Sequence, residues 1–376
     1  MIVPVLIGLG IISVILLEAF ETIILPRRVT RRFRLTRAFY VSLWVPTKAI
    51  ARLIRSGKAR ESFLSFFGPL SLLVLFALWA ASLIIGFGFL YYGNTPHDPT
   101  RPSLQTCFYL SGTTFFTLGL GDVTPHTAPE RVLAIFESGL GFGFLALIIS
   151  YLPVIYQAFS KREVTIVLLD ARAGSPPTAS ELLLRHAGPH GLDALLILFR
   201  DWEHWSAELL ESHISYPVVS YFRSQHTNES WLAALAAILD STALLIATSD
   251  NPCSRQARLT FAMCRHTVAD LAQVFFAKPR PDGPDRLPPD QLARLYTSLE
   301  QAGYQLRKDE DSENKLKELR AMYEPYLHAL ANFLFVELPP WILSSEVTEN
   351  WKTSAWGRIS GHSGHRHAAQ DIEEHF

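Results

Sequence analysis

The chain has 376 residues, 49% of them hydrophobic, which is long enough for two domains of ordinary size. Its formal charge is nearly balanced, but residues 1–162 hold 15 Lys and Arg against 7 Asp and Glu, a net of +8, whereas residues 163–376 hold 19 against 28, a net of −9. This asymmetry indicates that the two halves lie in different surroundings. The three cysteines, Cys107, Cys253 and Cys264, form no CxxC pair, so the sequence indicates neither a disulfide framework nor a zinc site.

Three apolar segments are long enough to cross a bilayer, which takes about 20 residues. They are residues 1–26, 69–92 and 131–158. A cleaved signal peptide does not explain the first segment, because no basic residues precede it and no Ala-x-Ala site follows it. The sequence therefore predicts an all-α membrane protein with three spanning helices.

A shorter apolar and aromatic segment, residues 103–116, lies between the second and third spans and leads straight into a glycine-bearing strand, residues 117–121. Non-helical backbone at membrane depth is tolerated only where it is buried in protein or lines a water-filled path. This order predicts a re-entrant pore loop, in which residues 103–116 form a pore helix capped by Ser103.

The strand after the pore helix alternates glycine with larger residues: Thr117, Leu118, Gly119, Leu120 and Gly121. Glycine adopts a positive φ without the steric cost of a Cβ, so such a strand can turn successive carbonyl oxygens to one side. Several copies around an axis would stack rings of carbonyls that replace the water shell of a cation. Asp122 would place negative charge at the mouth of this path, or serve as a turn residue with a local hydrogen bond.

The stretch from Thr117 to Asp122 resembles the selectivity filter of the tetrameric potassium channels, in the bacterial form with two transmembrane helices and a pore loop. This chain adds an N-terminal span to that form. The resemblance covers about residues 69–158. It implies a homotetramer, because one loop supplies a quarter of a filter, with K⁺ held by residues 117–121 as the transported ion. It implies no cofactor and no other metal.

The chain departs from the common form of this family at several positions. Val and Tyr are usual where this chain has Leu118 and Leu120, and paired tryptophans are common where it has Tyr109 and Leu110. Thr113 stands where some members carry a glutamate. The backbone chemistry needs only the glycines, but the phenol that braces the usual filter is missing at Leu120.

The third span contains residues at which helices bend, namely Gly141, Gly143 and Pro153. We expect them to be gating hinges of a pore-lining inner helix, and Pro153-Val154-Ile155 resembles the Pro-Val-Pro bend of voltage-gated potassium channels. Close helix packing through small residues is the alternative for the glycines. Glu137 is expected to pair behind the filter rather than contact the ion.

The loop between the first two spans, residues 27–67, carries eleven Lys and Arg residues against one acid, Glu61. The positive-inside rule places this loop in the cytoplasm, the N-terminus outside and the C-terminal half in the cytoplasm of a cell (inner) membrane. Apolar and basic residues in the loop predict an amphipathic helix on the anionic lipids of the inner leaflet. Glu18 and Glu21 are expected to pair with Arg27 and Arg28.

The C-terminal half predicts a linker over 161–177, a helical cytoplasmic domain over 178–344 and a flexible tail over 345–376. Residues 163–170 read as a short β-like run, with no GxGxxG motif after it, which argues against a nucleotide-binding regulatory domain. Residues 231–247 are apolar enough for a span, but their length and Asp240 favour a buried core helix. Trp202 and Trp205 are expected to be core residues.

These features predict a potassium-selective channel that conducts passively, is gated by its inner helix and is modulated by the cytoplasmic domain through residues 156–165. The alternatives are a non-selective monovalent cation channel and a membrane sensor with a vestigial pore loop. The sequence carries no nucleophile elbow, P-loop or metal-hydrolase motif, so we expect no enzyme, and nothing in it points to a nucleic acid partner. A cytoplasmic ligand is compatible with the helical domain, but no motif identifies it.

Overall fold

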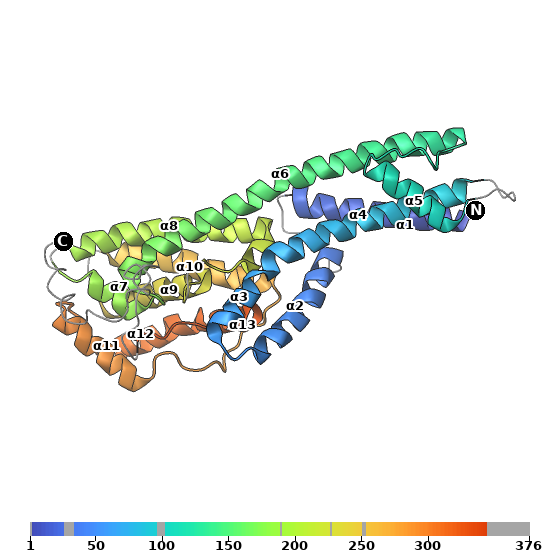
Figure 1. The fold of residues 1–376 in the computed structure, drawn as a ribbon. Coiled ribbons are helices and arrows are strands. Elements are labelled where there is room, and N and C mark those ends of the chain that lie inside the picture. Colours follow the sequence, from blue (N-terminus) through green and yellow to red (C-terminus); the bar gives the residue numbers. More distant parts are fainter. Residues whose placement is uncertain are drawn as a thin grey trace, which may run out of the picture. The chain divides into compact units, whose positions relative to one another are not determined.

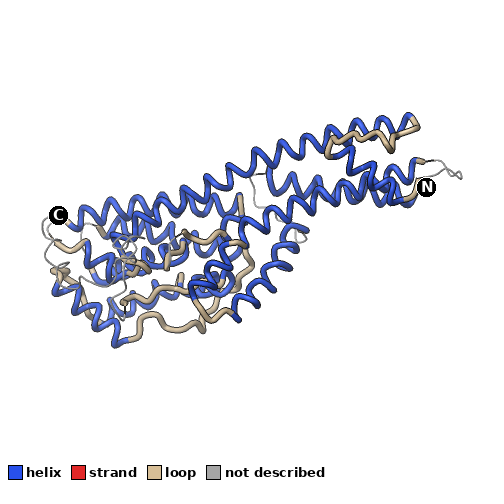
Figure 2. Tube along the Cα trace, in the orientation of Figure 1, coloured by secondary structure: helices blue, strands red, loops and turns tan. Residues whose placement is uncertain are grey.

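The computed structural model describes residues 2–25, 34–95, 102–188, 190–225, 228–249 and 253–343. Every regular element within these ranges is a helix, as Figure 2 shows, and no strand occurs among them. The predicted all-α class is therefore confirmed. The tail predicted over 345–376 and the cations Arg27, Arg28, Arg31 and Arg32 lie outside the described residues.

The chain divides into two units, of which the first comprises Met1–Lys161 and Glu211–Arg223. Its elements appear in Figure 1 and are α1 (Ile2–Ala19), the π-helix η1 (Phe20–Ile24), α2 (Leu35–Leu53), α3 (Gly57–Ser65), α4 (Phe67–Asn94), α5 (Leu104–Phe115), most of α6 (Ala128–Ala173) and the 3-10 helix η2 (Pro217–Tyr221).

The first unit contains the helices that match the three predicted spans. Stretches long and apolar enough to cross a membrane run over Ile2–Ile24, Gly57–Asn94 and Ala128–Ala173. Helices α1 and α4 pack side by side (Figure 1) through Gly8 and Gly86, where a Cβ built on Gly8 would lie 2.5 Å from the Gly86 carbonyl oxygen. Such close approach of two backbones is how helices associate in a bilayer.

The second unit comprises Arg162–Leu210 and Ser224–Phe376. Its elements are the end of α6, α7 (Ala179–Arg185), most of α8 (Gly191–Ser215), α9 (Trp231–Thr248), α10 (Ser254–Val274), α11 (Pro289–Gln301), α12 (Glu310–Ala321) and α13 (Glu324–Leu334). Thr178 caps the start of α7, where its hydroxyl accepts a hydrogen bond from the Glu181 amide at 3.2 Å.

Helix α9 is the centre of the second unit. It too is long and apolar enough to cross a membrane, but 94% of its apolar window is buried within the structure, against 17–50% for the three segments of the first unit. A lipid-facing helix would leave much of its surface uncovered by protein. The prediction that residues 231–247 form a buried core helix is therefore confirmed.

Helix α6 corrects two expectations. The linker predicted over 161–177 is helical as far as Ala173, and the β-like run over 163–170 is wrong, since these residues continue the helix. The buried positions Ile166, Leu169 and Ala173 recur at three- and four-residue spacing, which is the period of a helix. Packing of this face overrides the local strand preference of the branched residues between them.

Candidate functional site

The predicted pore helix is α5, and both of its ends are fixed by hydrogen bonds. At the start, the Ser103 hydroxyl accepts a hydrogen bond from the Thr106 amide at 3.1 Å, as expected of a cap. At the end, the Leu118 amide donates to the Thr113 carbonyl oxygen at 2.8 Å, and the Thr117 amide donates to the Thr114 carbonyl oxygen at 3.0 Å. The chain thus passes directly from the helix into residues 117–121, a stretch outside regular secondary structure for which we keep the name glycine-bearing strand.

Backbone dihedrals alternate along this strand. Thr117 has φ 56°, Gly119 has φ 56° and Gly121 has φ 81°, while Leu118 and Leu120 between them are not among the residues with positive φ. Glycine takes such values readily, but a β-branched residue such as Thr117 is strained there. The sequence suggested the alternation at the two glycines, and the structure extends it to Thr117.

The strand is open on the sides that its side chains face. Leu118 and Leu120 are 60% and 64% exposed, and a Cβ built on Gly119 or Gly121 would meet no atom within 4 Å. Neighbouring protein in this single chain therefore does not enclose the strand.

Asp122, which follows the strand, is held by the pore helix. The Tyr109 hydroxyl donates a hydrogen bond to Asp122 Oδ2 at 2.8 Å. A phenol therefore does brace this region, although it comes from α5 and not from the strand position occupied by Leu120. Tyr109 stands where tryptophan is usual, and only the fold reveals its partner.

The Glu137 side chain links α6 to α4 and α5. It is fully buried, its Oε2 accepts a hydrogen bond from the Tyr91 hydroxyl of α4 at 2.8 Å, and its Oε1 lies within hydrogen-bond distance of the Ser111 hydroxyl of α5. The Ser111 hydroxyl also lies 2.8 Å from the Ile84 carbonyl oxygen. A buried carboxyl needs such partners to offset its desolvation. The expected pairing of Glu137 within the protein is therefore present.

The residues expected to be hinges differ in their surroundings. A Cβ built on Gly141 would lie 2.1 Å from the Phe115 carbonyl oxygen, so this glycine lets α6 approach the end of α5. A Cβ built on Gly143 would meet no atom within 4 Å. Pro153 lies inside α6, which continues as a helix on both sides of it. Hinge motion at these residues stays a prediction.

The start of α6 carries a cap that the sequence analysis missed. The Glu130 carboxylate accepts hydrogen bonds from the His126 and Thr127 amides at 2.9 and 3.2 Å, and Thr95 donates to it at 2.9 Å. The Thr127 hydroxyl accepts a hydrogen bond from the Glu130 amide in return. The signal was the Thr-x-x-Glu pattern of a capping box.

Glu18 also has a role that the sequence analysis did not predict, at the start of α2. Leu35 and Thr36 are the first residues of α2. The fully buried Glu18 carboxylate accepts hydrogen bonds from their amides at 3.1 and 3.0 Å. A negative charge is favourable at the positive end of a helix. Glu21 lies 3.9 Å from Arg34, while the arginines expected as partners fall outside the described residues.

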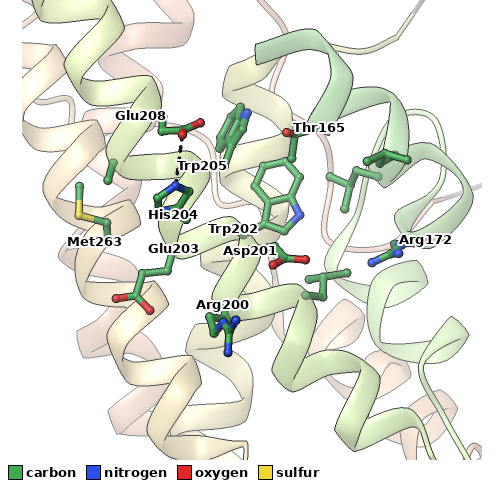
Figure 3. A pocket seen from close by; sticks show the side chains of 14 residues that line it. Thr165, Arg172, Arg200, Asp201, Trp202, Glu203, His204, Trp205, Glu208 and Met263 are labelled. Atoms are coloured by element: carbon green, nitrogen blue, oxygen red, sulfur yellow. Dashed lines mark ion pairs between the residues drawn. The ribbon is translucent and has the colours of Figure 1, made fainter. Parts of the chain in front are cut away.

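The second unit contains an open pocket between α6, α8 and α10 (Figure 3). Trp202 and Trp205 are buried beside it with ring centroids 4.4 Å apart, which confirms that they are core residues. His204 pairs with Glu208 at 3.2 Å (Figure 3). Charges of both signs line the rest of the pocket, and no group of three or more metal ligands occurs among the described residues. Burial raises the pKa of the Cys264 thiol to about 12, which disfavours the thiolate form.

Comparison with known proteins gives a match that covers the site. Residues 73–157 match the family model described as an ion channel, and no curated protein and no solved structure gives a match to the chain. The matched segment runs from α4 through α5 and the glycine-bearing strand into α6. The second unit lies outside the match.

Proposed function

From the premise that residues 73–157 form a pore-loop ion channel module, we propose that the chain is a potassium-selective channel. The observation that carries the proposal is the alternation of φ at Thr117, Gly119 and Gly121. Such an alternation can turn successive carbonyl oxygens to one side, and oxygens arranged in this way replace the hydration shell of K⁺ in a selectivity filter. Conduction is passive, down the electrochemical gradient, and needs no cofactor.

The charges around the strand support a cation as the transported ion. The carboxyl end of α5 meets the strand at Thr117, and the negative end of a helix dipole favours a cation. Thr117 adds a hydroxyl oxygen to its carbonyl oxygen, and Asp122 adds a carboxylate beyond Gly121.

A homotetramer follows from the proposal, because one loop supplies one quarter of each carbonyl ring. Large apolar side chains beside the site support this assembly, since Leu120 on the strand and Ile135 and Phe142 on α6 are 64%, 76% and 70% exposed. Neighbouring copies and lipid would cover such surfaces.

The inner helix gates the proposed pore, with bending at Gly141, Gly143 or Pro153, and the second unit modulates it. The N-terminus lies outside a cell inner membrane, and the second unit lies in the cytoplasm. In this orientation α2 rests on the anionic inner leaflet. Val45 and Leu53 on that helix are 61% and 80% exposed, as a lipid-facing side requires.

Two rival functions rest on specific features. Leu120 lacks the usual phenol, which favours a non-selective cation channel, and the unmatched second unit favours a membrane sensor with a vestigial pore loop. K⁺ efflux from liposomes that hold the purified full chain separates the channel from the sensor. We expect rapid efflux through assemblies whose mass equals four chains. Sealed liposomes with well-folded protein would contradict conduction of any kind.

The Tyr109–Asp122 hydrogen bond makes a testable contribution to selectivity. Tyr109→Phe removes the hydroxyl that holds the Asp122 carboxylate, so we expect this variant to have a lower K⁺ over Na⁺ permeability ratio than the wild type. The phenyl ring stays, so the fold is retained. Tyr326→Phe, on α13 of the second unit, is the matched control and should leave the ratio unchanged. An unaltered ratio in Tyr109→Phe would show that this bond does not brace the ion path.

A further inference from the structure

Part of the C-terminal half of the chain is built into the first unit. Residues Glu211–Arg223, which we call the returning segment, comprise the last turn of α8, a short connection and η2. The chain before and after the segment belongs to the second unit. Within the segment Val219 is fully buried, and Val218 and Phe222 are each 5% exposed. All three belong to one hydrophobic core cluster that also contains residues of α1, α4, α5 and α6.

One side of the returning segment packs against the inner helix. The ring of Tyr216 lies 5.8 Å from that of Tyr151, and the ring of Phe222 lies 6.2 Å from that of Tyr156 and 5.5 Å from that of Phe159. These three residues of α6 flank Pro153, the residue at which we expect the inner helix to bend. The segment thus touches α6 immediately before and after that proline.

The other side of the returning segment packs against the outer helices. The Tyr221 ring stacks on Tyr40 of α2 at 5.6 Å and lies 5.2 Å from Trp44 of α2 and 5.2 Å from Phe67 of α4. A Cβ built on Gly68 would lie 2.7 Å from the Phe222 ring, so α4 leaves no free space at this contact.

We infer that the returning segment is the element through which the second unit sets the position of the inner helix, with Tyr216 and Phe222 as its positioning residues. The inference rests on the proposed channel function and replaces the route through residues 156–165 as the main one. Because a close-packed core has few alternative arrangements, a shift of the segment between α4 and α6 must displace one of them. Both ends of the segment continue into the second unit, which can therefore pull on it.

Perturbation from either side of the contact tests the inference. Phe222→Ala removes the ring, and Gly68→Ala pushes against it from α4. In single-channel recordings of the full chain in bilayers, we expect each variant to change the open probability at least tenfold. Unitary conductance and reversal potential should stay at the wild-type values, because the filter is untouched.

Matched controls separate gating from general destabilisation. Gly10→Ala on α1 adds a methyl group where no atom lies within 4 Å, and Phe66→Ala removes an exposed ring next to Phe67. Both should gate like the wild type. Wild-type open probability in Phe222→Ala and Gly68→Ala would overturn the inference while leaving the channel itself intact. If the wild-type protein passed no current, this result would contradict the proposed function, and the inference with it.

A reversible cross-link gives an independent test. The double variant Phe159→Cys/Phe222→Cys replaces two rings whose centroids lie 5.5 Å apart, and the native Cys107, Cys253 and Cys264 are buried. Oxidation of the reduced, conducting protein should fix the open probability at one value, and reduction should restore it. An open probability that does not respond to formation of the disulfide would overturn the inference.

Discussion

Gly119→Ala is expected to abolish K⁺ flux while the protein still inserts and assembles. An L-residue with a Cβ at φ 56° costs roughly 1–2 kcal/mol, and the cost would recur in each chain of the proposed tetramer. The added methyl group meets no atom within 4 Å, so the effect comes from the backbone and not from packing. We expect the strand to relieve this strain by rotating a peptide bond, which would turn a carbonyl oxygen of each chain away from the proposed ion path.

The control for this variant is Gly10→Ala, which adds the same methyl group on α1 where no atom lies within 4 Å. Flux through equal amounts of each assembled protein in liposomes gives the measurement. Wild-type flux through Gly119→Ala would mean that the ion path does not run along residues 117–121.

Asp240→Ala is expected to cost about 3–5 kcal/mol of stability in the second unit. The Asp240 carboxylate pairs with Arg286, with Nη2 to Oδ2 at 2.5 Å and Nη1 to Oδ1 at 3.2 Å, and accepts a hydrogen bond from Tyr323 at 2.7 Å. Burial by itself lowers the pKa of the Arg286 guanidinium, but the Asp240 charge more than offsets this and raises it above the ordinary value. Removal of Asp240 therefore leaves a buried cation without its main counter-charge.

Thermal unfolding of the full chain in detergent, followed by tryptophan fluorescence, measures this loss. Lys315→Ala is the control, because it breaks an exposed pair with Glu318 that contributes 0–1 kcal/mol. The double variant Asp240→Leu/Arg286→Met should recover much of the stability, since it removes both buried charges. Unfolding of Asp240→Ala at the wild-type temperature would show that the pair does not hold the second unit together.

The sequence was sufficient for features that depend on local pattern. The three spans, the cap at Ser103, the re-entrant order of helix and strand and the buried character of α9 all follow from residue type and spacing. Glu137 was also assigned a pairing role, because a carboxyl inside a span needs a partner. Its partners Tyr91 and Ser111 could not be named, since only the packing of three helices brings them together.

Features that depend on distant contacts were not predictable in this way. The returning segment has no sequence signal, because Tyr221 meets partners at positions 40, 44 and 67, far away along the chain. The run of Val164, Thr165, Ile166 and Val167 favours a strand locally, yet it continues α6, because Ile166 is buried on a helical face. Tertiary packing decides such segments.

In the proposed channel, four copies of the strand from Thr117 to Gly121 select K⁺. The reversal potential of the wild-type protein, with K⁺ on one side of a bilayer and Na⁺ on the other, measures this selectivity. We expect a large potential with the sign set by K⁺ moving down its gradient. A reversal potential close to zero would show that Na⁺ passes as readily as K⁺ and would contradict the proposed selectivity.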